Sequence, residues 1–252
     1  MNRVVLGVWW LVVFVSCTPD RTEQATPFVE VTESAGLRFV HRSGARGELH
    51  YPEVMGAGVG LIDFDRDGDL DVYLANGGAL EGRVLGAGDR VFRNEWVPSG
   101  RLRFSDVTEQ VGAVAHGYGT SVTVGDIDGD HWPDLYVGQV GANVVLWNRE
   151  GRFVAEPEQS EIIGNEWTTG AALFDADGDL DVDLVVINYV EFSTDKRGGC
   201  VYQFGGRDYC GPLSYPASPN HFFENLGGRR FRKRAFDPPG EPRPSLGITV
   251  FD

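Results

Sequence analysis

Three segments of the chain carry four aspartates at offsets 0, +2, +4 and +8, each between an apolar run and a run rich in β-forming residues. We call these segments ladders one, two and three. They consist of Asp63, Asp65, Asp67 and Asp71; of Asp126, Asp128, Asp130 and Asp134; and of Asp175, Asp177, Asp179 and Asp183. Two like charges ~4 Å apart repel by roughly 4 kcal/mol at an effective dielectric of ~20. A chain that builds such a cluster three times is expected to neutralise it with a hard cation, and all-oxygen ligation favours Ca²⁺.

The EF-hand is the competing calcium-binding motif, and the ladders do not fit it. An EF-hand loop ends in a bidentate glutamate at its twelfth position and lies between helices. The twelfth positions of the ladders are Leu74, Val137 and Val186, inside runs of β-forming residues. Because each ladder closes its own site, we expect up to three structural calcium ions and no catalytic one.

The ladders belong to a longer repeat that predicts four strands per unit. One strand precedes each ladder, and a run covered on both faces follows it. Further along each unit, an aromatic or apolar residue precedes an asparagine, and a turn and a phenylalanine follow. This pattern predicts a third and a fourth strand. The first strands are predicted at 58–62, 121–125 and 170–174, and the second strands at 72–75, 135–138 and 184–187. The third strands are predicted at 92–94, 146–148 and 223–225, and the fourth strands around Phe104, Phe153 and Phe231. Such units are typical of the four-stranded blades of an all-β β-propeller.

The ladders resemble FG-GAP/VCBS repeats, the calcium-loop blades of integrin α-subunit propellers. Other segments are similar to the UnbV/cartilage-acidic-protein group. They are the four runs 28–32, 35–37, 39–41 and 51–56 near the start of the chain, and Tyr209–Pro212 in the insertion. The resemblance covers about residues 28–252. It implies ligation by the side chains at 0, +2, +4 and +8 and by the backbone carbonyl at +6, which belongs to Asp69, Trp132 and Asp181.

The residue at offset +5 differs among the ladders. It is Gly68 in ladder one, but His131 in ladder two and Leu180 in ladder three. A left-handed turn at this position strains a residue that has a Cβ atom. We therefore expect ladders two and three to bind calcium more weakly than ladder one.

Residues 1–17 predict an export signal. The apolar stretch 4–15 is too short to span a bilayer, which takes ~20 residues. It resembles a bacterial lipoprotein signal in which Cys17 is lipidated, although Phe14 replaces the usual leucine. An uncleaved anchor or an ordinary signal peptide is the alternative. With a polar linker at 18–27, the protein is expected to be exported and lipid-anchored to the bacterial cell envelope or surface.

Cysteine parity in an exported chain predicts a disulfide between Cys200 and Cys210, in an insertion at about 192–219.

The net charge of −15 argues against nucleic acid as a partner. Neither a Gly-x-Ser-x-Gly elbow nor a Walker loop is present in the sequence, and we assign no catalytic residue.

Two functions remain open at this point. The first is a calcium-stabilised, non-catalytic binding or adhesion module for an unknown protein or glycan, which meets the membrane only through its lipid. The second is an enzyme, or an accessory to one, acting on a polysaccharide or secondary metabolite at the propeller axis. Fold alone does not decide between them.

The repeat count predicts an incomplete ring. A fourth unit begins at Gly247 and reaches its first ladder aspartate at Asp252. The resemblance implies about seven blades in a complete propeller, so we expect a C-terminally truncated, open arc of three to four blades. Terminal blades in such an arc expose apolar sheet, which favours instability or self-association.

Overall fold

The computed structural model describes residues 28–78, 80, 88–113, 115–155, 161–195, 199–203, 205–234, 236 and 242–250. The chain divides into two compact units, Met1–Val31 and Thr32–Asp252, and all strands lie in the second. The predicted signal, Cys17, the linker and Asp252 fall outside the described residues. Within the described ranges, no helix combines the length and the apolar character needed to cross a membrane.

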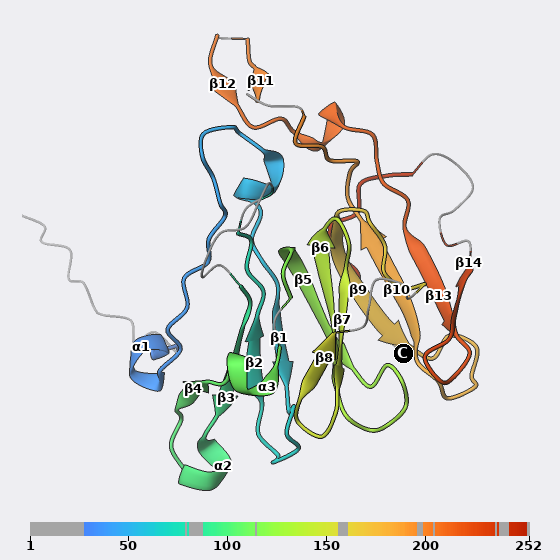
Figure 1. Ribbon diagram of the computed structural model, residues 1–252. Coiled ribbons are helices and arrows are strands. Elements are labelled where there is room, and N and C mark those ends of the chain that lie inside the picture. The colour runs from blue at the N-terminus through green and yellow to red at the C-terminus, as the bar shows by residue number, and fades with distance from the viewer. Residues whose placement is uncertain are drawn as a thin grey trace, which may run out of the picture. The chain divides into compact units, whose positions relative to one another are not determined.

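The second unit contains three four-stranded antiparallel sheets, which we call blades one, two and three (Figure 1). Each confirms the prediction of four strands per repeat. Blade one contains β1 (Val59–Ile62), β2 (Asp71–Leu74), β3 (Arg90–Asn94) and β4 (Phe104–Asp106). Blade two contains β5 (Tyr118–Gly125), β6 (Asp134–Val140), β7 (Val144–Asn148) and β8 (Phe153–Ala155). Blade three contains β9 (Thr168–Phe174), β10 (Asp183–Asn188), β13 (His221–Asn225) and β14 (Phe231–Arg234).

The blades form an open, β-propeller-like arc. Their inner strands adjoin in the order β1, β5, β9. Gly58, at the entrance to β1, permits the close approach to β5, because a Cβ atom there would lie 2.6 Å from the backbone of Ser121. Among the described residues, no strand of blade one pairs with a strand of blade three, so the arc stays open.

The segment 242–250 runs beside blade three. The Ser245 N–H donates to the Asn188 carbonyl at 3.1 Å, and the Thr169 hydroxyl donates to the Ser245 carbonyl at 2.6 Å. The described part of this segment forms no strand, so the sequence prediction of a first strand in a fourth unit is wrong for residues 247–250.

Hydrophobic clusters fill the two spaces between the blades. Successive residues of a strand point to opposite faces, so Leu135 contacts the cluster shared with blade one and Tyr136 the cluster shared with blade three. All residues of β10 are buried. The near-continuous apolar runs after the ladders therefore reflect strands covered on both faces, as the sequence predicts.

The connections carry short helices that the sequence pattern did not predict: α1 (Thr32–Ala35), η1 (Tyr51–Val54), α2 (Trp96–Ser99), α3 (Thr108–Val111) and η2 (Pro212–Ser214). The insertion contains a small hairpin of β11 (Cys200–Val201) and β12 (Arg207–Asp208), which lies at the top of Figure 1. Cys200 and Cys210 form the predicted disulfide. An aromatic cluster around Trp167, Tyr189 and Tyr215 packs the base of the insertion against Tyr51.

Candidate metal centres

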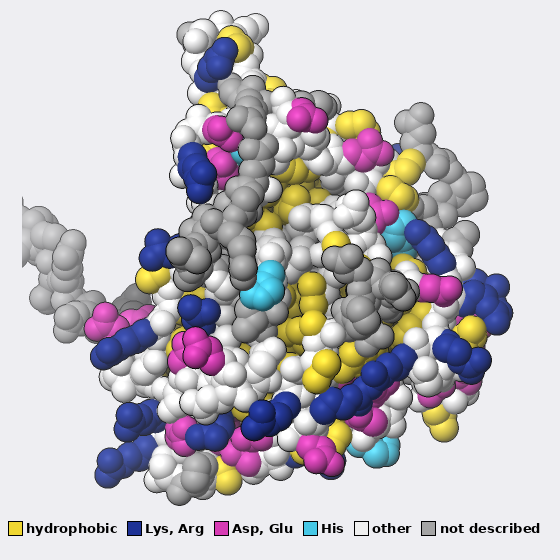
Figure 2. Space-filling model, in the orientation of Figure 1, with side chains coloured by type: hydrophobic (Ala, Val, Ile, Leu, Met, Phe, Trp, Pro, Cys, Tyr) yellow, Lys and Arg dark blue, Asp and Glu magenta, His cyan; other side chains and the backbone are white. Residues whose placement is uncertain are grey.

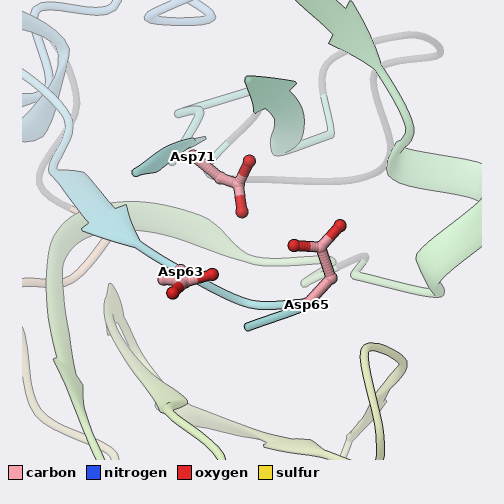
Figure 3. A group of neighbouring side chains, drawn as sticks. All are labelled: Asp63, Asp65 and Asp71. Carbon is pink, nitrogen blue, oxygen red and sulfur yellow. The ribbon is translucent and has the colours of Figure 1, made fainter. Parts of the chain in front are cut away.

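Each ladder brings three of its four aspartates together where the first strand of the blade ends and the second begins. In every ladder, oxygens of the 0, +2 and +8 side chains lie within 4.8 Å of one another. Figure 3 shows this in ladder one, where Asp63 follows β1, Asp65 lies in the loop and Asp71 opens β2. Carboxylates at such separations repel, so the arrangement favours a cation between them.

The +8 aspartate is the buried anchor of each ladder. Asp71 and Asp134 are 0% exposed, and Asp183 is 1% exposed. In ladder two, the carboxylate of Asp134 accepts the Ile127 N–H at 3.0 Å and the Asn148 N–H at 2.8 Å. The same two bonds, from the +1 residue and the third-strand asparagine, recur in ladders one and three. The anchor thus ties the loop to the third strand.

Burial changes the acidity of these anchors. It raises the pKa of Asp71 and of Asp134 to about 7, although the backbone hydrogen bonds oppose the shift. Burial also raises the pKa of Asp65. A divalent cation beside these carboxyls would stabilise their ionised forms and lower the raised pKa values again.

The +4 aspartates are not members of the three converging groups. Each instead accepts the backbone N–H at +6, at 3.1 Å in ladder one, 2.9 Å in ladder two and 3.0 Å in ladder three. The first aspartate of each ladder accepts the N–H at +5, at 3.2, 2.9 and 3.1 Å. These bonds shape the loops. Ligation by the +4 side chains and by the carbonyls of Asp69, Trp132 and Asp181 stays a prediction.

Two residues of each loop have left-handed backbone, at offsets +3 and +5. The φ angles are 59° and 96° in ladder one, 76° and 71° in ladder two, and 83° and 76° in ladder three. The sequence identified the +5 position, where His131 and Leu180 are indeed left-handed. It missed the +3 position, which is glycine in ladders two and three but Arg66 in ladder one.

The ladders differ in how their carboxylate oxygens are satisfied. In ladder one, Oδ1 of Asp63 and Oδ1 of Asp65 are buried without a hydrogen-bond partner. In ladder two, Asp128 accepts bonds from two arginines. In ladder three, Asp175 and Asp177 are exposed. A buried polar atom without a partner costs about 1–3 kcal/mol, so the orphaned oxygens of ladder one fit a bound cation.

The third-strand asparagines link neighbouring blades, a role that the sequence pattern did not disclose. The side-chain amide of Asn148 in blade two donates to the Phe64 carbonyl in ladder one at 2.8 Å. The amide of Asn225 in blade three donates to the Ile127 carbonyl in ladder two at 3.1 Å. The loops of ladders one and two are therefore also contact points for the next blade.

A shallow hollow runs along the inner strands at the propeller axis. Its lining residues are Gly58, Val59, Thr120, Ser121, Val122, Thr123, Thr169, Gly170, Ala171, Gly247 and Ile248. Peptide groups and hydroxyls supply the polar atoms, and none of these described residues has an ionisable side chain. These groups can donate and accept hydrogen bonds.

Comparison with curated proteins found no match to this chain. The family model described as an FG-GAP-like repeat matches residues 63–137, from the first aspartate of ladder one into β6. This part of the chain is therefore similar to an FG-GAP-like repeat, in keeping with the blade architecture around it.

Proposed function

We propose that this chain is a calcium-stabilised, extracytoplasmic β-propeller module that binds a protein or glycan and has no catalytic role of its own. The observation that carries the proposal is the threefold convergence of the 0, +2 and +8 carboxylates. The buried, unpartnered oxygens of Asp63 and Asp65 support it, because a cation would satisfy them.

In this proposal, the side chains at 0, +2 and +8 hold the calcium ion, and the +4 side chain and +6 carbonyl complete its oxygen shell. The ion cancels the repulsion between the carboxylates and fixes the turn between the first two strands of each blade. The +8 aspartate then couples the occupied loop to the third strand through its bond to the asparagine N–H.

The architecture supports the proposed binding role. FG-GAP-like repeats build propeller modules that often serve in binding, and the axial hollow offers peptide and hydroxyl groups to a ligand. Its lining favours recognition over acid–base chemistry. The enzyme alternative requires a polar residue outside the ladders whose substitution abolishes turnover of a substrate. A screen of the purified protein against glycans and secreted proteins separates the binding module from the enzyme, because the module binds a ligand without turnover.

Calorimetric titration of the chelated protein tests the calcium sites. We expect heat from up to three sites and a higher melting temperature in calcium than in chelator. Asp63→Asn should remove one site, while Asp195→Asn, an exposed aspartate outside the ladders, should remove none. Titration without heat, together with an unchanged melting temperature, would refute the proposal.

We extend the proposal to lipid anchoring at Cys17, on the strength of the short apolar segment that ends there. Mass spectrometry of the membrane fraction should find a diacylglyceryl group on that cysteine. A mature protein that begins elsewhere and carries no acyl chain would contradict this part of the proposal and leave the calcium sites untouched.

A further inference from the structure

We propose that Arg149 and Arg229 are built-in counter-ions of ladder two, which compete with calcium for Asp128 and make this ladder a weaker calcium site than ladder one. The inference rests on the proposed calcium-binding function. It concerns the difference in calcium affinity between ladder two and ladder one, which the shared spacing of their aspartates does not reveal.

The competition centres on one oxygen atom. Oδ2 of Asp128 accepts a bond from Nη2 of Arg149 at 3.0 Å. The same oxygen accepts a bond from Nε of Arg229 at 2.8 Å, and Nη2 of Arg229 also lies 2.8 Å away. The Asp128 side chain is only 5% exposed, so water screens these pairs poorly. Charge-assisted bonds of this kind are about twice as strong as neutral ones.

The two arginines come from different blades. Arg149 follows β7 in blade two and also pairs with Oδ2 of Asp130. Arg229 lies in the turn between β13 and β14 of blade three, and its guanidinium stacks on the Trp147 ring at 4.5 Å from the ring centre. Figure 2 shows acidic and basic side chains interspersed along the lower edge of the molecule, where Figure 1 places turns between strands.

The other ladders lack this arrangement in the part of the chain that the structure describes. In blade one, Arg93 pairs with Glu95 at 2.9 Å and acts on Asp65 and Asp71 only through its charge, and Oδ1 of both Asp63 and Asp65 stays without a hydrogen-bond partner. In blade three, Arg230 donates to the backbone carbonyls of its own turn. Two positive charges therefore offset the four carboxylates of ladder two, whereas a cation is the evident partner for the orphaned oxygens of ladder one.

Both arginines bond Oδ2 of Asp128, and its Oδ1 accepts only the Asp130 N–H at 3.3 Å. Whichever oxygen calcium engages, a divalent cation beside this carboxylate repels both guanidinium groups and competes with them for the same negative charge. Binding at ladder two is thus opposed by two ion pairs, one of which joins blade two to blade three. Removing the arginines should make the site bind metal more tightly.

Terbium luminescence follows metal binding in the full chain, because Tb³⁺ replaces calcium and is sensitised by a nearby indole. Trp132 lies inside ladder two, and Asp126→Asn identifies the part of the signal that arises there. We compare the parent with the double variant Arg149→Gln/Arg229→Gln. The matched control is Arg207→Gln/Arg243→Gln, which removes two positive charges from exposed arginines that pair with no ladder carboxylate among the described contacts.

The double variant should lower the terbium concentration at half-saturation of ladder two by about tenfold, or about 1.4 kcal/mol, while the control leaves it within about twofold. Calcium should displace the ion with a matching gain in affinity. An unchanged or higher midpoint in the double variant overturns the inference, as does an equal fall in the control or a lack of ladder-two signal in both parent and variant. Calcium heat lost in Asp63→Asn tests the proposed function separately, because it reports ladder one.

Discussion

Replacing Asp89 by asparagine should change the stability of the protein in opposite directions at pH 8 and pH 4. Asp89 is 1% exposed. Its carboxylate accepts the hydroxyl of Tyr73 and, at 2.7 Å, the N–H of Asn76. Blade two builds the same contact without a charge: Asn143 accepts the Gln139 N–H at 2.9 Å and donates to the Tyr136 hydroxyl at 2.9 Å. Asparagine is therefore a fold-compatible replacement.

The magnitude follows from the acidity of Asp89. Burial raises its pKa from 3.8 to about 6, although hydrogen bonds from Tyr73 and Asn76 and the charge of Arg90 oppose the shift. Since the native pKa exceeds the unfolded one, this carboxyl removes stability as the pH rises from about 4 to about 6, and the loss persists above that range. Roughly two pKa units correspond to about 3 kcal/mol.

The asparagine variant avoids that loss but rearranges one bond. The Tyr73 hydroxyl turns from donor to acceptor, at a cost of about 1 kcal/mol. We expect a net gain of about 2 kcal/mol at pH 8 and a net loss of about 1 kcal/mol at pH 4, where Asp89 is already neutral. Urea unfolding followed by tryptophan fluorescence at both pH values measures the two differences.

The reverse exchange in blade two serves as the matched comparison. Asn143 is 2% exposed, and Asn143→Asp places a carboxyl in the corresponding environment. This variant should lose more stability at pH 8 than at pH 4. If Asp89→Asn changes the unfolding free energy by the same amount at both pH values, then the carboxyl is not held at a raised pKa and the reasoning fails.

Two further predictions concern the loops. His131→Gly and Leu180→Gly should each raise the unfolding free energy by about 1 kcal/mol, because both positions have left-handed backbone (φ 71° and 76°), and thermal melts that show no gain would contradict this. Asn148→Ala should cost about 1–2 kcal/mol more in chemical unfolding than Asn94→Ala, because Asn148 also bonds the Phe64 carbonyl of the neighbouring blade at 2.8 Å, and equal losses would exclude that bond as a stabilising link.

The strands and the ladders could be predicted because their signals are local. Apolar runs mark strands such as β6 and β10, and the spacing of Asp126, Asp128 and Asp134 within nine residues fixes where their carboxylates meet. Cysteine parity identified the Cys200–Cys210 disulfide for a similar reason, since the insertion offers no other partner.

The features that could not be predicted depend on packing between blades. Arg229 and Asp128 are 101 residues apart, and Asn225 and Ile127 are 98 residues apart. Only the right twist and spacing of adjacent sheets bring such pairs together. The segment 247–250 matches a first strand in sequence, but a strand also needs a neighbouring strand to pair with. Among the described residues, this segment belongs to no sheet.

The ladder loops serve two purposes at once. Phe64 and Ile127, at the +1 position of their ladders, lie beside the converging carboxylates and accept the asparagine amides of the following blade. In ladder two, Asp128 itself also receives an arginine from the following blade. If the proposed calcium orders a loop, it would therefore also order the surface on which the next blade packs. For this reason, we expect chelation to lower the melting temperature of the whole arc, which unfolds in one cooperative transition, and not merely to loosen three surface turns.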